Sequence, residues 1–330
     1  MKALVTGACG QLGYYLCAHL VALGYQVTGL TRRQKIDPED RVDGVVYKTG
    51  DVQDASLVYD LLVHEAPDEV YNLAAEAFVP TSWTGPWIVF QINTQGVLNF
   101  LETIVRTGLK TRFYQAGSSE MFGDAPPPQN EDTPLRPLSP YAASKAAAFH
   151  LVRQYRMGYE GLFACNGICF NSESPRRLPH FVTRHVTQGV AAIAQGWETA
   201  PQLGRDTALL IGSLNQVRDW GHARDTVRAM HLMLQRPRPD DYVIATGQGR
   251  TVQELVELAF LMIGKRAVVG ENVIVTEARK RRNDRLTLYG DARKARAVLG
   301  WVPTISFERM IEEMIAHDRN LIRKRMAEVR

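Results

Sequence analysis

The chain has few of the features that mark disulfide-rich, metal-binding or nucleic-acid-binding proteins. It holds four cysteines in 330 residues, and none of them forms a Cys-x-x-Cys pair. Neither a disulfide framework nor a cysteine metal site is expected from this spacing, and a few reduced thiols are typical of a cytoplasmic protein. The net charge of +4 is too small for this length to predict binding of nucleic acid. We therefore expect neither a metal nor a nucleic-acid partner.

Long apolar runs are also missing. The first apolar run, at residues 2–6, leads directly into glycines, so the N-terminus lacks the pattern of a secretory signal peptide. No stretch is long enough and apolar enough to span a bilayer. The hydrophobic content of 45% and the charged content of 22% are ordinary for a soluble globular protein. These features predict a cytoplasmic protein without a membrane partner.

Short apolar runs alternate with helical patterns up to about residue 170. Runs such as 69–73 and 112–116 have the composition of buried parallel strands, and the amphipathic stretch 93–107 lies between them. This alternation predicts an α/β protein with a Rossmann-type doubly wound parallel sheet.

The regular pattern is lost after Phe170. We expect residues 1–170 to form a dinucleotide-binding Rossmann domain and residues 171–330 to form a smaller C-terminal α/β substrate lobe. Residues 215–247 are expected to return to the first domain.

A glycine-rich turn follows the first predicted strand. The motif Gly-x-x-Gly-x-x-Gly lies between that strand and a helical pattern, which is the context that a dinucleotide site requires. Glycines allow the backbone to approach a pyrophosphate, and the helix N-terminus offers free N–H groups. We expect the pyrophosphate contacts to come from this turn, namely from Gly7, Gly10, Gln11, Leu12 and Gly13.

The end of the second predicted strand indicates which dinucleotide is bound. An acidic residue there would bind the ribose 2′-hydroxyl of NAD, but the chain has Thr31-Arg32-Arg33. A guanidinium suits a 2′-phosphate, so the sequence favours NADP with Arg32 as a contact. Two further segments lie at carboxyl ends of strands, where ligands bind in open α/β sheets. They supply Asp51 and Val52, beside the adenine, and Leu73, Ala74 and Ala75, which leave room for the cofactor.

A helix that begins at Ser139-Pro140 carries the predicted catalytic pair. A serine followed by proline is a typical helix start, and Tyr141 and Lys145 then lie one turn apart on the same face. An ammonium group beside a phenol stabilises the phenolate, so we expect the pKa of Tyr141 to be lowered. Such a tyrosine can take a proton from an alcohol while a hydride leaves the same carbon.

With these motifs in order, the chain resembles the extended short-chain dehydrogenase/reductase family and, within it, the GDP-mannose 4,6-dehydratases. The resemblance covers nearly the whole chain. It rests on strings that include residues 70–75, 112–116, 118–123, 173–177, 181–184, 218–223 and 244–247.

The resemblance implies NADP-dependent dehydration of GDP-mannose to GDP-4-keto-6-deoxymannose, with internal hydride transfer from C4 to C6. Tyr141 would take the C4 hydroxyl proton, and Lys145 would lower its pKa and hold the nicotinamide ribose. Ser118 would hydrogen-bond the C4 oxygen, and Glu120 would be the base at C5.

The resemblance also implies substrate contacts and self-association. Contacts with the GDP-sugar are expected from Asn171, Arg184, Arg218 and Arg281. The helices at 93–107 and 141–157 are candidates for an isologous interface, so we expect a homodimer or a homotetramer.

Other functions stay open at this point. The chain has Ser172 and Glu76-Ala77 where the family pattern has His and Gln-Ser, so another nucleotide sugar is an alternative substrate. A GDP-sugar 4-keto reductase or epimerase of the same family would not need Glu120. A catalytically silent NADP-binding protein would not need an intact set of Ser118, Glu120, Tyr141 and Lys145.

Overall fold

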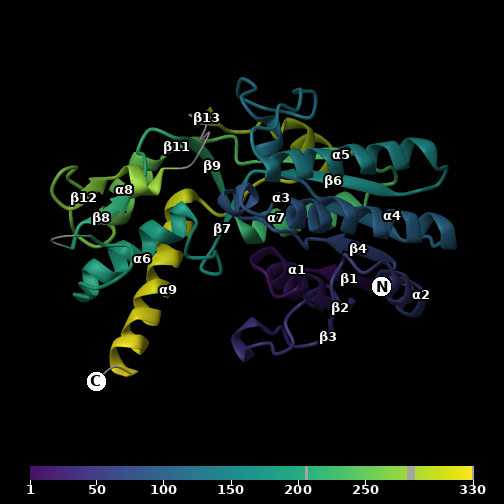
Figure 1. The fold of residues 1–330 in the computed structure, drawn as a ribbon, viewed down its shortest axis with the longest axis horizontal. Coiled ribbons are helices and arrows are strands. Elements are labelled where there is room, and N and C mark those ends of the chain that lie inside the picture. Colours follow the sequence, from purple (N-terminus) through teal and green to yellow (C-terminus); the bar gives the residue numbers. More distant parts are fainter. Residues whose placement is uncertain (205–206, 281–286, 329–330) are drawn as a thin grey trace.

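The structure is a computed structural model that describes residues 1–204, 207–280 and 287–328. Arg281, one of the expected substrate contacts, lies outside the described residues. Seven parallel strands of the described chain form one sheet with the order β10-β6-β5-β4-β1-β2-β3 (Figure 1). They are β1 (Lys2–Thr6), β2 (Gln26–Thr31), β3 (Val45–Thr49), β4 (Glu69–Asn72), β5 (Arg112–Ala116), β6 (Ala164–Cys169) and β10 (Asp241–Ile244).

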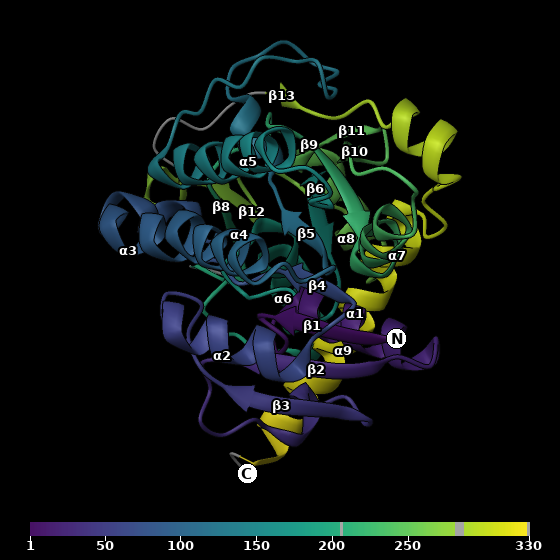
Figure 2. The same ribbon diagram turned by 90° about the vertical axis from the view of Figure 1, so that its right-hand side faces the viewer.

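Helices cover both faces of this sheet (Figure 2), and each face has its own buried apolar core. One face carries α1 (Gln11–Ala22) and α7 (Ala223–Leu234). The other face carries α2 (Ala55–Glu65), α4 (Gly96–Thr107) and α5 (Pro140–Gly158), with the short α3 (Pro86–Phe90) against α5. The expectation of a doubly wound parallel sheet is confirmed.

The direction of chain progression reverses between β1 and β4. From β1 the sheet grows outward through β2 and β3, and from β4 it grows the other way through β5 and β6. In open α/β sheets a ligand binds at such a reversal, beyond the carboxyl ends of the strands. A ligand-binding site is therefore expected beyond the carboxyl ends of β1 and β4.

The smaller lobe consists of residues that follow β6. A second sheet has the order β11-β9-β13, with β7 also paired to β9, and β8 pairs with β12. Three helices pack around a separate apolar core beside these strands (Figure 1). The elements are β7 (Asn171–Glu173), α6 (Val182–Gln195), β8 (Leu209–Ile211), β9 (Val217–His222), β11 (Gly249–Thr251), α8 (Val252–Leu261), β12 (Val273–Val275), β13 (Thr287–Leu288) and α9 (Phe307–Glu328).

The segment 215–247 contributes to both units. Its β10 pairs with β6 at the edge of the large sheet, and its α7 packs against α1, whereas its β9 belongs to the second sheet. Within the described ranges, no helix has both the length and the apolar composition needed to cross a membrane.

Candidate active site

The turn between β1 and α1 has the form of a pyrophosphate cradle. Gly7 adopts φ +64°, and a Cβ on Gly13 would lie 2.2 Å from the carbonyl oxygen of Gly7, so larger residues do not fit this turn. Gly10 is the N-cap of α1 and provides no side-chain cap for the first-turn amides. The residues of that first turn line the cleft at the positive end of the helix, where a phosphate binds well. The residues present fit a dinucleotide.

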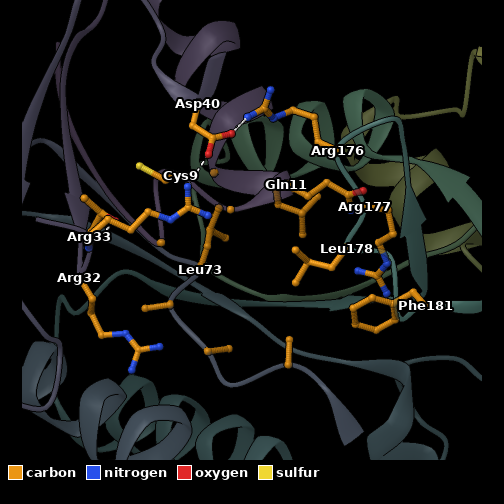
Figure 3. Close-up of a pocket in the computed structure, with 18 of the residues that line it drawn as sticks. Cys9, Gln11, Arg32, Arg33, Asp40, Leu73, Arg176, Arg177, Leu178 and Phe181 are labelled. Carbon is orange, nitrogen blue, oxygen red and sulfur yellow. Dashed lines mark hydrogen bonds and ion pairs between the residues drawn. The ribbon is translucent and has the colours of Figure 1, made fainter. Parts of the chain in front are cut away.

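A cleft of about 890 Å³ opens above this turn (Figure 3). Tyr141 and Lys145, which are also expected at the cofactor, are not among its lining residues, but the other eleven cofactor contacts expected from the sequence lie on its wall. These residues are Gly7, Gly10, Gln11, Leu12, Gly13, Arg32, Asp51, Val52, Leu73, Ala74 and Ala75. The cleft is bounded on its other side by the loop that follows β7 and by the C-terminal part of α9.

Hydrogen bonds hold the two walls of the cleft together. The Gln11 side chain donates to the Ser172 carbonyl at 2.7 Å and accepts from the Ser174 hydroxyl at 2.7 Å. The Thr6 hydroxyl donates to Asn72 and accepts from the amides of Leu73 and Ala74. The glycine turn, the end of β4 and the segment after β7 therefore keep a fixed spacing.

Charged side chains gather at the end of the cleft next to β2 and β3. Arg32 lies 3.9 Å from Asp51, and its side chain is 59% exposed. Arg33 and Arg176 both pair with Asp40, and the Arg176 guanidinium lies over the Tyr14 ring at 3.7 Å. Arg176 was not expected from the sequence, because nothing in its local pattern predicts that it reaches a loop 136 residues earlier.

The predicted start of α5 is confirmed. The Ser139 hydroxyl accepts a hydrogen bond from the Ala142 amide, and Pro140 is the first helical residue. The helix places Tyr141 and Lys145 in the protein interior, 8% and 3% exposed. The Ser118 hydroxyl hydrogen-bonds the Tyr141 side chain and also accepts from the Glu120 amide. The structure thus brings Ser118, Glu120, Tyr141 and Lys145 to one place.

The expected lowering of the pKa of Tyr141 is wrong for the free protein. Burial removes the phenol from water and raises its pKa to about 12, although the hydrogen bond from Ser118 acts in the opposite direction. The Lys145 ammonium donates to the Ala116 carbonyl at 2.9 Å. Burial also lowers the pKa of Lys145 to about 8. Tyr141 is therefore a neutral phenol in this state.

A buried asparagine that sequence reasoning missed supports this helix. The predicted helix at 93–107 is an α-helix only from Gly96, because residues 91–95 form a π turn. Within that turn the Asn93 amide donates to the Ser144 hydroxyl and to the Glu76 carbonyl, and its oxygen accepts from the Glu76 amide. Asn93 thereby joins α5 to the segment after β4. No signal in the sequence singles out Asn93, because Gln91, Thr94 and Gln95 beside it are polar as well.

A second, smaller cavity of about 90 Å³ adjoins the catalytic group. It brings Glu120 together with two of the expected substrate contacts, Asn171 and Arg218. Arg279 and Lys280 add two further cationic side chains, which the sequence analysis did not single out. Phe181 lines both this cavity and the larger cleft, so the two spaces lie on either side of one residue.

Arg184 has other partners than expected. Its guanidinium is ion-paired with Asp318 at 2.7 Å and donates to the carbonyls of Pro175 and Arg177. These bonds join α6 to α9 and to the loop after β7. The neighbouring Arg177 lies over the Phe181 ring at 3.5 Å and forms part of the cleft wall. A contact between Arg184 and the substrate stays a prediction.

Comparisons with known proteins point to one family. A family model described as GDP-mannose 4,6 dehydratase matches residues 4–314. GDP-mannose 4,6 dehydratase 2 of Arabidopsis thaliana is 42% identical, over 98% of this chain and 88% of its own length. GDP-mannose 4,6-dehydratase of Yersinia enterocolitica is 39% identical, over 96% of this chain and 93% of its own length.

The fold also matches solved structures of other enzymes. UDP-glucose 4-epimerase of Thermus thermophilus, in complex with NAD, has a TM-score of 0.83 and 27% identity, over 97% of this chain and 99% of that chain. The fold is thus shared with an epimerase, whereas the family model and the more similar relatives share one description. Since that model and those relatives extend over nearly the whole chain, the chain belongs to the GDP-mannose 4,6-dehydratase family.

Proposed function

We propose that the protein converts GDP-mannose to GDP-4-keto-6-deoxymannose with NADP as a cofactor that is regenerated in each turnover. The observation that carries this proposal is the position of Glu120. Its side chain lines the small cavity beside Asn171 and Arg218, and its amide bonds to Ser118, the partner of Tyr141. A reductase or a 4-epimerase needs no carboxylate there, whereas an elimination needs a base.

The large cleft is the proposed cofactor site. The first-turn amides of α1 would bind the pyrophosphate, Asp51 and Val52 would lie at the adenine, and Leu73 to Ala75 would line the path to the nicotinamide. The bound nicotinamide supplies reversible hydride transfer, from C4 of the sugar and later to C6. The choice of NADP over NAD rests on Arg32 and Arg33, which follow β2.

The side chains of the site supply the proton transfers. Tyr141 takes the proton of the C4 hydroxyl, with Ser118 hydrogen-bonded to the same phenol. The free protein holds Tyr141 as a neutral phenol. The phenolate that acts as the base must therefore form when cofactor and substrate are bound. Oxidation of C4 to a ketone makes the C5 proton acidic. Glu120 removes this proton and transfers a proton to the C6 hydroxyl, which leaves as water. Once C6 has received the hydride, Glu120 would pass a proton taken up from solvent to C5, which completes the product.

The substrate diphosphate is assigned to the cationic side of the small cavity. Arg218, Arg279 and Lys280 line it, and Asn171 offers a side-chain amide. Arginine suits a phosphate because its planar fork donates two parallel hydrogen bonds. A GDP-sugar bound there would place its hexose toward Glu120, which lines the same cavity.

The test is incubation of the pure protein with GDP-mannose in D₂O, with catalytic NADP and no reductant. Loss of one water together with deuterium at C5, read by mass and NMR, supports both the reaction and the base. Turnover of another nucleotide sugar in place of GDP-mannose would keep the reaction and change the substrate. Absence of dehydration with every nucleotide sugar would refute the function.

We also propose that the protein is a cytoplasmic homo-oligomer. All four cysteines are free thiols, which suits a reducing compartment. Trp87 is 76% exposed on α3, and α3 packs against α5, one of the two helices expected at a subunit interface. An exposed large aromatic ring on such a helix suits burial against a second copy. Light scattering after size-exclusion chromatography tests this, and a monomer at all concentrations would refute it.

A further inference from the structure

Asp40 joins two arginines that come from opposite walls of the cofactor cleft. One carboxylate oxygen pairs with Arg33, which follows β2, and the other pairs with Arg176, which follows β7. Figure 3 shows Asp40 between the two guanidinium groups, and Arg33 is among the residues that line the cleft. The carboxylate therefore lies at the edge of the space where the proposed cofactor binds.

The bridge is built from ordered parts. Asp40 ends the 3-10 turn Pro38–Asp40, and its amide donates to the Asp37 carbonyl at 2.9 Å. Arg176 is fixed by a hydrogen bond to the Glu39 carbonyl at 3.0 Å and by the Tyr14 ring. The side chains of Asp40 and Arg176 are both only 19% exposed. Partial burial weakens the competition from water, so this pair is stronger than a fully exposed one.

The charges at this end of the cleft already balance. Three guanidiniums, of Arg32, Arg33 and Arg176, share the wall with three carboxylates, of Glu39, Asp40 and Asp51. A 2′-phosphate carries up to two negative charges and needs at least one of these guanidiniums as a donor. Arg33, one of the arginines that line the cleft, is held by Asp40.

We propose that Asp40 is an internal competitor of the cofactor's 2′-phosphate and thereby sets how strongly the protein prefers NADP to NAD. This inference rests on the proposed dinucleotide site. Where Arg33 donates to the 2′-phosphate, binding of NADP competes with the Arg33–Asp40 pair and brings a phosphate near the carboxylate, whereas NAD does neither. Asp40 is therefore a specificity-determining residue that weakens the binding of NADP and has little effect on that of NAD.

The test is calorimetric titration of wild type, Asp40→Asn and Asp37→Asn, each freed of bound nucleotide. The ligands are NADP⁺ and 2′,5′-ADP, with NAD⁺ and 5′-ADP as counterparts that lack the 2′-phosphate. Asp37 is the matched control, because it is exposed, lies three residues before Asp40 and makes no side-chain cap bond. We expect D40N to bind NADP⁺ and 2′,5′-ADP about tenfold more tightly, with the other two ligands within about twofold and D37N unchanged.

A second pair of variants tests whether the tighter binding of the 2′-phosphate depends on Arg33. In an Arg33→Ala background, Asp40→Asn should improve binding of 2′,5′-ADP much less, since the arginine to be released is gone. Weaker binding of NADP⁺ to D40N would show that Asp40 positions the arginines and would overturn the inference. An equal gain for 5′-ADP, or no gain for any ligand, would overturn it as well. If wild type binds none of these nucleotides, the proposed cofactor site itself is refuted.

Discussion

The Arg184 guanidinium and the Asp318 carboxylate face each other in the interface between α6 and α9. Nε of Arg184 lies 2.8 Å from Oδ1 of Asp318, and the Thr187 hydroxyl donates to Oδ2 at 2.7 Å. Both charged side chains are buried. Because α9 also borders the cofactor cleft, this pair connects the packing of the smaller lobe to the site.

Loss of the Asp318 charge should destabilise the protein strongly. Asp318→Asn leaves a buried guanidinium without its counter-charge, so the free energy of unfolding should fall by about 3–5 kcal/mol. Glu312→Gln on the same helix breaks only an exposed pair with Arg309 and should change it by less than about 1 kcal/mol. Urea titration measures both, and equal effects would contradict a structural role for the buried pair.

The buried Lys145 should make stability depend on pH. Burial lowers its pKa from the ordinary 10.5 to about 8, so between these values the unfolded chain binds more protons than the folded one. The free energy of unfolding therefore rises with pH across that window. Relative to Lys145→Met, the wild type should gain about 2 kcal/mol from about pH 7 to about pH 9.5, in protein without cofactor.

The matched control is Lys265→Met, which removes an exposed lysine. Its difference from wild type should stay constant over the same pH range. If the difference in the free energy of unfolding between wild type and K145M were also constant, Lys145 would be charged in the folded protein throughout that range.

Glu120→Gln should separate the oxidation from the elimination. The variant keeps the side-chain shape and loses the base, so turnover should fall about a thousandfold. Oxidation at C4 does not need Glu120, so addition of GDP-mannose should produce a stable rise in absorbance from reduced dinucleotide. Asp124→Asn removes an exposed carboxylate on the same loop and should behave as wild type. Retention of dehydration by E120Q would remove Glu120 from the mechanism.

Gly13→Ala should abolish dinucleotide binding and destabilise the fold. The added Cβ would lie 2.2 Å from the Gly7 oxygen and 2.7 Å from the Ala8 Cα, both backbone atoms that cannot give way cheaply. At Gly158, near the end of α5, a Cβ meets nothing within 4 Å, so Gly158→Ala should be neutral or slightly stabilising. The unfolding temperatures of the two variants are measured with and without NADP⁺. An unchanged response of G13A to NADP⁺ would contradict the assignment of the cradle.

The features predicted correctly from the sequence are local ones. The glycine turn between β1 and α1 and the Ser139 cap of α5 each depend on residues within one turn or one helix. Their spacing alone determines which atoms come together.

The features that were missed depend on the tertiary fold. Arg176 meets Asp40 across 136 residues, and Arg184 meets Asp318 across 134, so no local pattern announces either partner. The raised pKa of Tyr141 has the same origin. The spacing to Lys145 is visible in the sequence, whereas the burial that dominates the pKa arises only when α5 packs on the sheet.

The late position of β10 in the chain has a consequence for synthesis on the ribosome. Six strands of the large sheet are complete by Cys169, but β6 acquires its outer neighbour only when residues 241–244 have been made. During that interval β6 is an unpaired edge that can bind other extended chains. Translation of the intervening residues at ordinary speed takes several seconds. The nascent chain therefore has a defined period in which chaperones would protect it, and faster pairing of this edge should improve the yield of folded protein.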